Sequence, residues 1–238
     1  MTSGDIIGLV LSYVYAFGML FIVESIGRRL EWPLFVTRKL VHIGAGLWIW
    51  AILFFFDNWT FGIIPFATFI VLNYIFYRQQ SFSAMDDEES TPGTVYFAIS
   101  ITILFALLWR TGDGAIDRVP IAAAGVMAMT IGDAFASLIG RRYGKNEYTF
   151  FGHTRTYEGS AAFLILAFFA VFLTLWLSSG SALSPNSPPI PIGTALIMAL
   201  VGTLVGAVAE GISPAGTDNL SVPLAVALAL FLLSLVLV

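Results

Sequence analysis

Apolar stretches of about twenty residues recur along the whole chain, and short polar segments separate them. A helix rises 1.5 Å per residue, so about twenty apolar residues cross the hydrocarbon core of a bilayer. The pattern predicts seven to eight membrane-spanning helices. Counted as eight, their approximate ranges are 6–26, 40–56, 59–77, 94–110, 119–139, 159–177, 192–209 and 220–238. The second and third are separated only by Asp57 and Asn58, which predicts a tight helical hairpin.

Composition supports a membrane protein. The chain is 58% apolar and only 11% charged, against about 25% charged residues in a soluble domain. We therefore predict an all-α, polytopic transmembrane helix bundle. Nothing marks a second domain, so residues 1–238 are taken as a single integral-membrane unit, and the N-terminus lacks the features of a signal peptide.

Charge and cysteine content exclude several classes of function. The net charge of −4 leaves no basic excess to bind nucleic acid. Without cysteine the chain has no disulfide framework, thiolate nucleophile or cysteine-based metal site. No pattern in the sequence indicates an oligomeric state.

The basic residues are distributed unevenly among the predicted loops. Nine of the eleven lie in residues 27–39, 78–93 and 140–158. Lys and Arg mark cytoplasmic loops, so we expect these three loops to lie on the cytoplasmic face, or on its topological equivalent, and both termini on the opposite face. The polar segments near residues 38–42, 78–93, 133–158 and 210–219 would then reach the same face.

An acidic residue interrupts the fifth apolar stretch. Gly132, Ala136 and Gly140 recur every fourth residue, which predicts a small-residue face that another helix can approach closely. Asp133 and Ser137 share the neighbouring stripe. Such a carboxylate and hydroxyl can bind Mg²⁺ or accept the proton of an alcohol. The alternative is an aspartate that only forms hydrogen bonds within the bundle.

Basic residues follow this helix directly. Arg141, Arg142 and Lys145 flank Gly144, and Arg155 precedes the start of the sixth stretch. Clustered cations beside a helix N-terminus suit a polyphosphate. The alternative is ordinary retention of positive charge on the cytoplasmic face, with lipid headgroup contact.

A second polar segment begins the second stretch. Arg38 and His42 lie four residues apart on one helix face, next to Lys39, and Gly46 one turn further on predicts a close helix approach. His42 can bind phosphate or act as an acid or base near neutral pH. It can equally satisfy one backbone carbonyl. His153 is expected to be a solvated loop residue.

The last polar segment separates the seventh and eighth stretches. Glu210, Asp218 and Asn219 offer oxygen ligands, and glycines at 211 and 216 allow the backbone to turn beside them. The alternative is a polar turn that caps the next helix. The acidic run at residues 86–89 is expected to be a solvated loop without chemistry.

Several motifs, in this order, resemble the polyprenol kinase family, which includes phytol, dolichol and farnesol kinases and the CTP-dependent diacylglycerol kinase. They are RKLVHIG (38–44), TPGTVYF (91–97), GDAFASLIGRRYGK (132–145), TYEGS (156–160) and DNLSVP (218–223). The resemblance spans about residues 37–225. It implies a multi-helix membrane enzyme that phosphorylates a lipid alcohol, typically from CTP with a divalent cation. The compact size and the TPGTVYF segment are most similar to the phytol kinase branch.

The resemblance also implies functional residues. The family's RK…H element corresponds to Arg38, Lys39 and His42. Its nucleotide-site block corresponds to Gly132, Asp133, Arg141, Arg142, Gly144 and Lys145. Its DN element corresponds to Asp218 and Asn219. Where the family often has Lys-Thr, this chain has Arg155-Thr156, and an arginine binds phosphate with two donors where a lysine offers a compact charge.

We therefore hypothesise CTP-dependent phosphorylation of a membrane-embedded isoprenoid alcohol, phytol in the first place, at the cytoplasmic face. The expected catalytic residues are Asp133, His42, Arg38 and Lys39. The expected nucleotide-binding residues are Arg141, Arg142, Gly144, Lys145, Arg155, Gly132 and Ser137. The expected Mg²⁺ ligands are Asp133, Asp218, Glu210 and Asn219. Asp133 is either a metal ligand or the base.

Three alternatives remain open. The substrate can be another lipid alcohol, such as dolichol, a polyprenol, farnesol or diacylglycerol. The enzyme can be a cytidylyltransferase that forms a CDP-lipid from an acceptor already phosphorylated. The chain can also be an ion-coupled transporter, which usually has two related halves that are not evident here.

Overall fold

The computed structural model describes residues 1–79, 81, 92–112, 114, 116–150, 153–214 and 216–238. Within these residues seven segments are long and apolar enough to cross a membrane, and an eighth apolar helix is shorter. The prediction of an all-α polytopic bundle with seven to eight spans is confirmed. The segments are α1 (Ser3–Arg29), α2 with α3 (Leu34–Leu47, Ile49–Phe55), α4 with α5 (Trp59–Gly62, Ile64–Gln79), the shorter α6 (Gly93–Leu108), α7 with η1 and α8 (Val119–Met127, Ala128–Asp133, Ala134–Tyr143), α9 (Tyr157–Ser178), α10 (Ile192–Ile212) and α11 (Asp218–Leu237).

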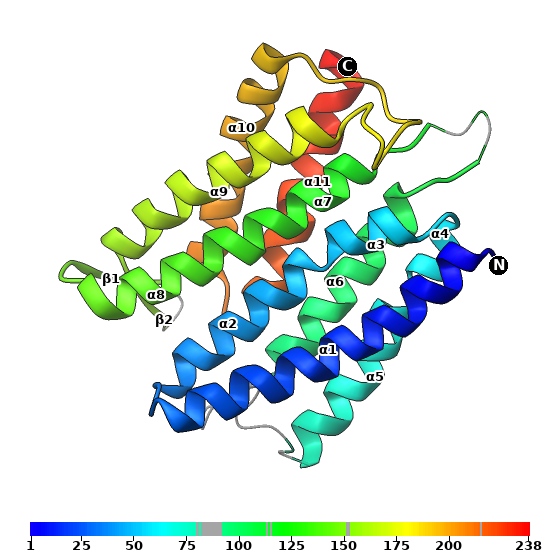
Figure 1. Cartoon of the computed structure of the whole chain (residues 1–238). Coiled ribbons are helices and arrows are strands. Elements are labelled where there is room, and N and C mark those ends of the chain that lie inside the picture. The colour runs from blue at the N-terminus through cyan, green and yellow to red at the C-terminus, as the bar shows by residue number, and fades with distance from the viewer. Residues whose placement is uncertain (80, 82–91, 113, 115, 151–152, 215) are drawn as a thin grey trace.

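The span formed by α7, η1 and α8 is the centre of the bundle. Of its most apolar part 78% is buried inside the protein, against 17% for α1. Its first half is rich in alanine, and small side chains let the surrounding helices approach its backbone. In Figure 1 this span (green) runs between α2–α3 on one side and α9 on the other.

A π-helix interrupts the central span. It covers Ala128–Asp133 and ends at the acidic residue that interrupts the apolar pattern. Single π-helical turns are rare and occur often at functional sites. Beside it α2 approaches closely, since a Cβ on Gly46 would collide with the Thr130 hydroxyl. The predicted close approach at Gly46 is confirmed, whereas the π-helix itself was not predicted.

The predicted small-residue face packs against α9. A Cβ on Gly132 would lie 2.8 Å from the Cβ of Ala167, and one on Gly140 would lie 2.8 Å from the Thr156 hydroxyl. Gly132 in η1 and Gly140 in α8 therefore set how closely this span packs against α9 and its N-cap, Thr156, which confirms the predicted role of the stripe.

The two ends of the bundle are made of different parts of the chain. Both termini lie at one end, and the C-terminus of α1 and a β-hairpin lie at the other (Figure 1). The hairpin pairs β1 (Glu147–Phe150) with β2 (His153–Thr156), and Tyr148 is opposite Arg155. We expected only a loop here.

The predicted acidic loop at residues 86–89 lies outside the described residues.

At the end with the termini, Asp5 of α1 holds the turn between the second and third spans. Its Oδ1 accepts hydrogen bonds from the backbone nitrogens of Asp57 and Asn58, each at 3.1 Å, and its Oδ2 accepts one from the Asn58 side chain at 2.7 Å. The turn at Asp57 and Asn58 is confirmed, because α3 ends at Phe55 and α4 begins at Trp59.

Candidate active site

A polar cavity of about 480 Å³ lies between α2, α8, the hairpin, α9 and the junction of α10 with α11. Among the described residues, the ionisable side chains that line it are balanced in charge. They are Arg38, Lys39, Arg141 and Arg155, with Asp133, Glu147, Glu210 and Asp218. Segments far apart in the sequence therefore bring their charged groups to one place.

A second cavity, of about 130 Å³, lies between α1, α2, α5 and α6. Aliphatic and aromatic side chains make up most of its lining. Arg38 and Lys39 line both cavities, so the apolar and the polar cavity adjoin at the start of α2. A molecule with an apolar tail and a polar end can therefore occupy the apolar cavity and reach the polar one.

Asp133 lies at this junction. Its Oδ2 is 2.7 Å from the Lys39 Nζ and 3.9 Å from the His42 Nε2. The His42 Nε2 is also 3.4 Å from the Met129 carbonyl oxygen, and its ring meets Phe97 edge to face. The Asp133 side chain is only 5% exposed, so its charge depends on Lys39 for compensation.

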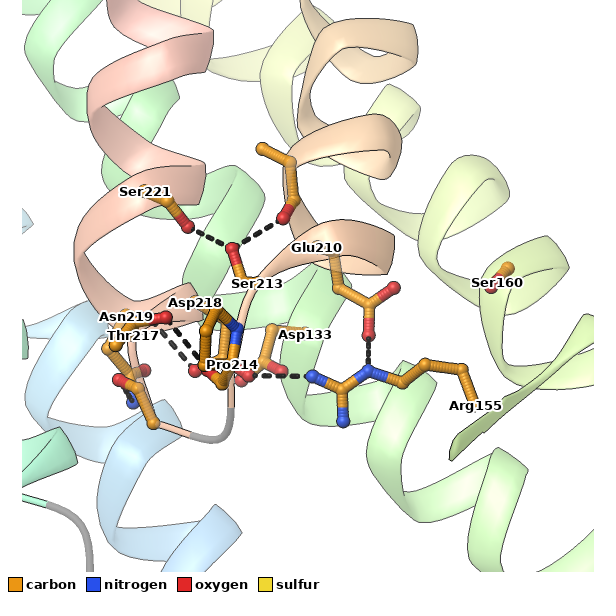
Figure 2. A network of polar contacts seen from close by, with 12 residues as sticks. Asp133, Arg155, Ser160, Glu210, Ser213, Pro214, Thr217, Asp218, Asn219 and Ser221 are labelled. Atoms are coloured by element: carbon orange, nitrogen blue, oxygen red, sulfur yellow. Dashed lines mark hydrogen bonds and ion pairs between the residues drawn. The ribbon is translucent and has the colours of Figure 1, made fainter. Parts of the chain in front are cut away.

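Arg155 connects the ends of two helices. Its Nε lies 3.0 Å from the Glu210 Oε1 on α10, and a terminal guanidinium nitrogen donates to the Asp218 Oδ2 at 3.3 Å on α11. Figure 2 shows the guanidinium between the two carboxylates, with Asp133 nearby. The predicted cation and the predicted acids thus form one network.

A fixed turn places Asp218 in this network. The backbone nitrogen and the hydroxyl of Thr217 both donate to the Pro214 carbonyl oxygen, at 3.0 and 2.8 Å. Gly216 has φ of +81°, a conformation that glycine adopts without strain. The hydroxyls of Ser213 and Ser221 are hydrogen-bonded across the turn (Figure 2). Proline, glycine and three hydroxyl groups therefore fix the start of α11.

The structure separates the predicted site residues into groups. Those that line the polar cavity are Arg38, Lys39, Asp133, Ser137, Arg141, Gly144, Arg155, Glu210 and Asp218. His42 and Asn219 line the apolar cavity instead. Gly132 packs against α9, and neither Arg142 nor Lys145 lines either cavity. Arg142 donates to the Tyr143 hydroxyl, and Lys145 is exposed.

Other residues at the site were missed by sequence analysis. The hairpin brings Glu147 and Thr154 to the polar cavity, and Ser160 follows on α9 with its hydroxyl 2.7 Å from that of Tyr148. Aromatic and β-branched residues around Gly152 were the available signal for a hairpin. His153 is half-buried in β2 rather than in an open loop.

The oxygen donors fit Mg²⁺ bound together with phosphate oxygens. Mg²⁺ prefers oxygen ligands and is usually held by one or two carboxylates plus substrate phosphates and water. Among the described residues, no three acidic or histidine side chains are close enough to form a metal site by themselves. Lys39 pairs with Asp133, and Arg155 with Glu210 and Asp218. A metal ion at these carboxylates would therefore need further oxygen ligands from outside the protein.

Comparison with curated proteins shows which family the chain belongs to. The chain is 30% identical over 230 residues to a phytol kinase from Synechocystis sp., a match that covers 93% of this chain and 88% of the relative. The chain belongs to the polyprenol kinase family. This membrane protein is a lipid-alcohol kinase.

Two further relatives extend the comparison. The kinase is 29% identical over 211 residues to a probable chloroplastic phytol kinase from Triticum aestivum, covering 83% of this chain and 67% of the relative. It is 27% identical over 249 residues to a chloroplastic farnesol kinase from Arabidopsis thaliana, covering 94% and 76%. No family model matches the kinase, and no solved structure matches it significantly.

Proposed function

We propose that this kinase transfers the γ-phosphoryl group of CTP, with Mg²⁺, to the hydroxyl of a membrane-embedded isoprenoid alcohol, with phytol as the preferred acceptor. The observation that carries the proposal is the junction of a charged cavity with an apolar one at Arg38 and Lys39. A nucleotide suits the first cavity and an isoprenoid tail the second. The relatives' names supply phytol and farnesol as acceptors of those proteins.

The charge balance of the polar cavity favours a divalent cation. Among the described residues, four cationic and four acidic side chains line it and cancel one another in charge, so a triphosphate that enters alone brings uncompensated negative charge into a confined space. Asp133 and Asp218, with Glu210 nearby, are the residues that would hold a Mg²⁺ ion entering with the nucleotide, and its charge would offset part of that excess. It would supply charge neutralisation on the transferred phosphoryl group.

The cationic side chains of the cavity would position the phosphates. Arg155 exchanges one or both of its carboxylate partners for phosphate oxygens, which a guanidinium can bind with two donors. Arg141 lines the same cavity. Lys39, at the junction, is placed to contact the phosphoryl group and the acceptor hydroxyl together, and positioning of this kind is most of what phosphoryl transfer requires.

The acceptor hydroxyl would lie near His42 and Asn219, which both line the apolar cavity. The Asn219 side-chain nitrogen reaches the Gly216 carbonyl oxygen at 3.4 Å, and its Oδ1 is buried without a hydrogen-bond partner in the described part of the chain. A buried amide oxygen without a hydrogen-bond donor is costly. The hydroxyl group of a bound alcohol would donate the missing hydrogen bond. We therefore assign Asn219 to the acceptor instead of to the metal.

During transfer the hydroxyl oxygen bonds to the γ-phosphorus as the bond between that phosphorus and the β,γ-bridging oxygen breaks. CDP leaves, and the hydroxyl proton passes to a base. Asp133 is the candidate base if it does not hold the metal ion, because its carboxylate faces the junction beside Lys39. If Asp133 holds the metal ion, His42 is the base. The products are CDP and the alcohol monophosphate, so atoms and charge balance.

The decisive experiment is an assay of the purified kinase in lipid nanodiscs with γ-labelled CTP, ATP, GTP and UTP. The acceptors are phytol, farnesol, geranylgeraniol, dolichol and diacylglycerol. We expect label in phytyl phosphate, from CTP most efficiently. Label released as pyrophosphate would instead indicate a cytidylyltransferase, and an Asp133→Asn variant with full activity would exclude both roles assigned to that residue.

A further inference from the structure

The apolar cavity has a defined end away from the charged junction. Lys39 lies at one end of its α2 wall and Trp48 at the other, nine positions further along the chain. At the helical rise per residue this is roughly 13 Å. The cavity therefore extends a limited distance from the place where the acceptor hydroxyl is expected.

Trp48 is held rigidly at that end by α1. Its indole nitrogen donates to the Ser12 hydroxyl at 3.0 Å, and Ser12 in turn donates to the Gly8 carbonyl oxygen at 2.7 Å. The indole stacks on the Tyr15 ring with the centroids 4.1 Å apart, and the Tyr15 hydroxyl donates to the Gly44 carbonyl oxygen at 2.9 Å. Two helices thus fix the position of the indole.

Aromatic contacts join α1 to α5 beside the cavity, and one of the rings, Phe69, also lines it. Phe17 lies against Phe69 and Phe76, with ring centroids 6.0 and 6.4 Å apart, and Tyr13 also meets Phe69 at 6.0 Å. The Tyr13 hydroxyl donates to Thr68 at 2.9 Å. These contacts hold α1 and α5 together beside the cavity, whose α2 wall runs from Lys39 to Trp48.

We propose that Trp48 determines the length of the acceptor alcohol by closing the far end of the apolar cavity. The inference rests on the proposed function. An alcohol that fits between Lys39 and the indole buries its whole tail, whereas each additional isoprene unit meets the indole and has to bend or leave the cavity. Burial of each added carbon atom is otherwise favourable. A tail that the indole keeps partly outside the cavity loses this contribution, so kcat/KM falls for alcohols longer than the cavity.

The test uses two opposite substitutions and a matched control. Trp48→Ala removes the wall, and Ala45→Phe fills the same cavity about one turn nearer to Lys39, since Ala45 also lines it. Trp50→Ala removes the neighbouring indole, which packs outside the cavity lining. The measured quantity is the ratio of kcat/KM for a longer alcohol to kcat/KM for a shorter one. For Trp48→Ala the pair is a polyprenol longer than geranylgeraniol against phytol, for Ala45→Phe it is phytol against farnesol, and for Trp50→Ala both pairs are measured.

We expect Trp48→Ala to raise this ratio roughly tenfold and Ala45→Phe to lower it by a similar factor, because each isoprene unit carries several buried carbon atoms. Trp50→Ala should leave it unchanged. Activity on farnesol shows that each variant has folded, and Trp48→Phe gives a smaller shift in the same direction if Trp48→Ala does not fold. Ratios unchanged in an active enzyme overturn this inference alone, whereas a wild-type kinase inactive on every alcohol overturns the proposed function.

Discussion

Asp218 and Asn219 are consecutive in the chain, yet Asp218 lines the polar cavity and Asn219 lines the apolar one. The Asn219 backbone nitrogen donates to the Asp218 Oδ1 at 2.9 Å, so the two side chains are held in a fixed relation. The first turn of α11 therefore separates the two cavities and contributes one polar group to each.

This separation predicts different kinetic defects for neighbouring substitutions. Asn219→Ala should raise the KM for the alcohol roughly two- to tenfold, because the loss of one neutral hydrogen bond weakens binding by about that factor. It should leave the KM for CTP unchanged. Asp218→Asn should raise the KM for CTP and the Mg²⁺ requirement. Steady-state kinetics with each substrate varied in turn measure both. If Asn219→Ala changed the Mg²⁺ dependence instead, the metal-ligand role expected from the sequence would be favoured.

Two adjacent arginines provide a second test. Arg141 lines the polar cavity, whereas Arg142 points to Tyr143. Arg141→Gln should raise the KM for CTP at least tenfold, because a hydrogen bond between charged groups contributes about 1.5–3 kcal/mol. Arg142→Gln is the matched control and should change it less than twofold. Equal losses in the two variants would mean that general positive charge, and not contact in the cavity, explains the effect.

The close approach of α2 to the π-helix can be tested through stability. In Gly46→Ala the new methyl group collides with the Thr130 side chain, so the variant should lose about 1–3 kcal/mol, the usual cost of overpacking. In detergent its midpoint of thermal unfolding should fall. Gly18→Ala in α1 is the control, because a Cβ there meets nothing within 4 Å. A Gly46→Ala variant as stable as Gly18→Ala would show that α2 and the π-helix can move apart without loss of stability.

The orientation in the membrane can be tested by chemical labelling, because the chain contains no cysteine. Lys145 lies at the site end of the bundle, and Ala182 follows α9 at the end that carries the termini; both are exposed. A membrane-impermeant maleimide added to intact cells should label Ala182→Cys and spare Lys145→Cys until the membrane is opened. The reverse result would place the site on the outer face.

The sequence predicted those parts of the site that depend on helical spacing and chain order. Asp133 and Ser137, four residues apart, do line one cavity, and Asp218 reaches it from the far end of the chain. The spacing could not separate Arg141 from Arg142, because both end the same helix and only the position of its neighbours distinguishes them. The apolar cavity left no signal, since its lining is as hydrophobic as the residues that face lipid.

The hairpin and the π-helix were missed for different physical reasons. The hairpin is four residues per strand within a polar segment, too short to show alternation clearly. The π-helix has no sequence signal of its own, because apart from Thr130 and Asp133 the residues of Ala128–Asp133 are small or aliphatic, like those of the helix before it. Packing of Gly46 against Thr130 accompanies it, and such tertiary contacts are not visible in a linear pattern.

The π-helix also decides where the central span tolerates a change of length. A π turn holds one residue more than an α turn, so deleting a single position among 128–132 would leave an ordinary α turn, and Asp133 would keep its direction towards Lys39. Deleting one position within α7 instead would rotate the side chains after it by about 100° relative to those before it. Asp133 would then turn away from Lys39 with its chemistry intact, so the loss of one residue would silence the enzyme at one place and be absorbed at the other.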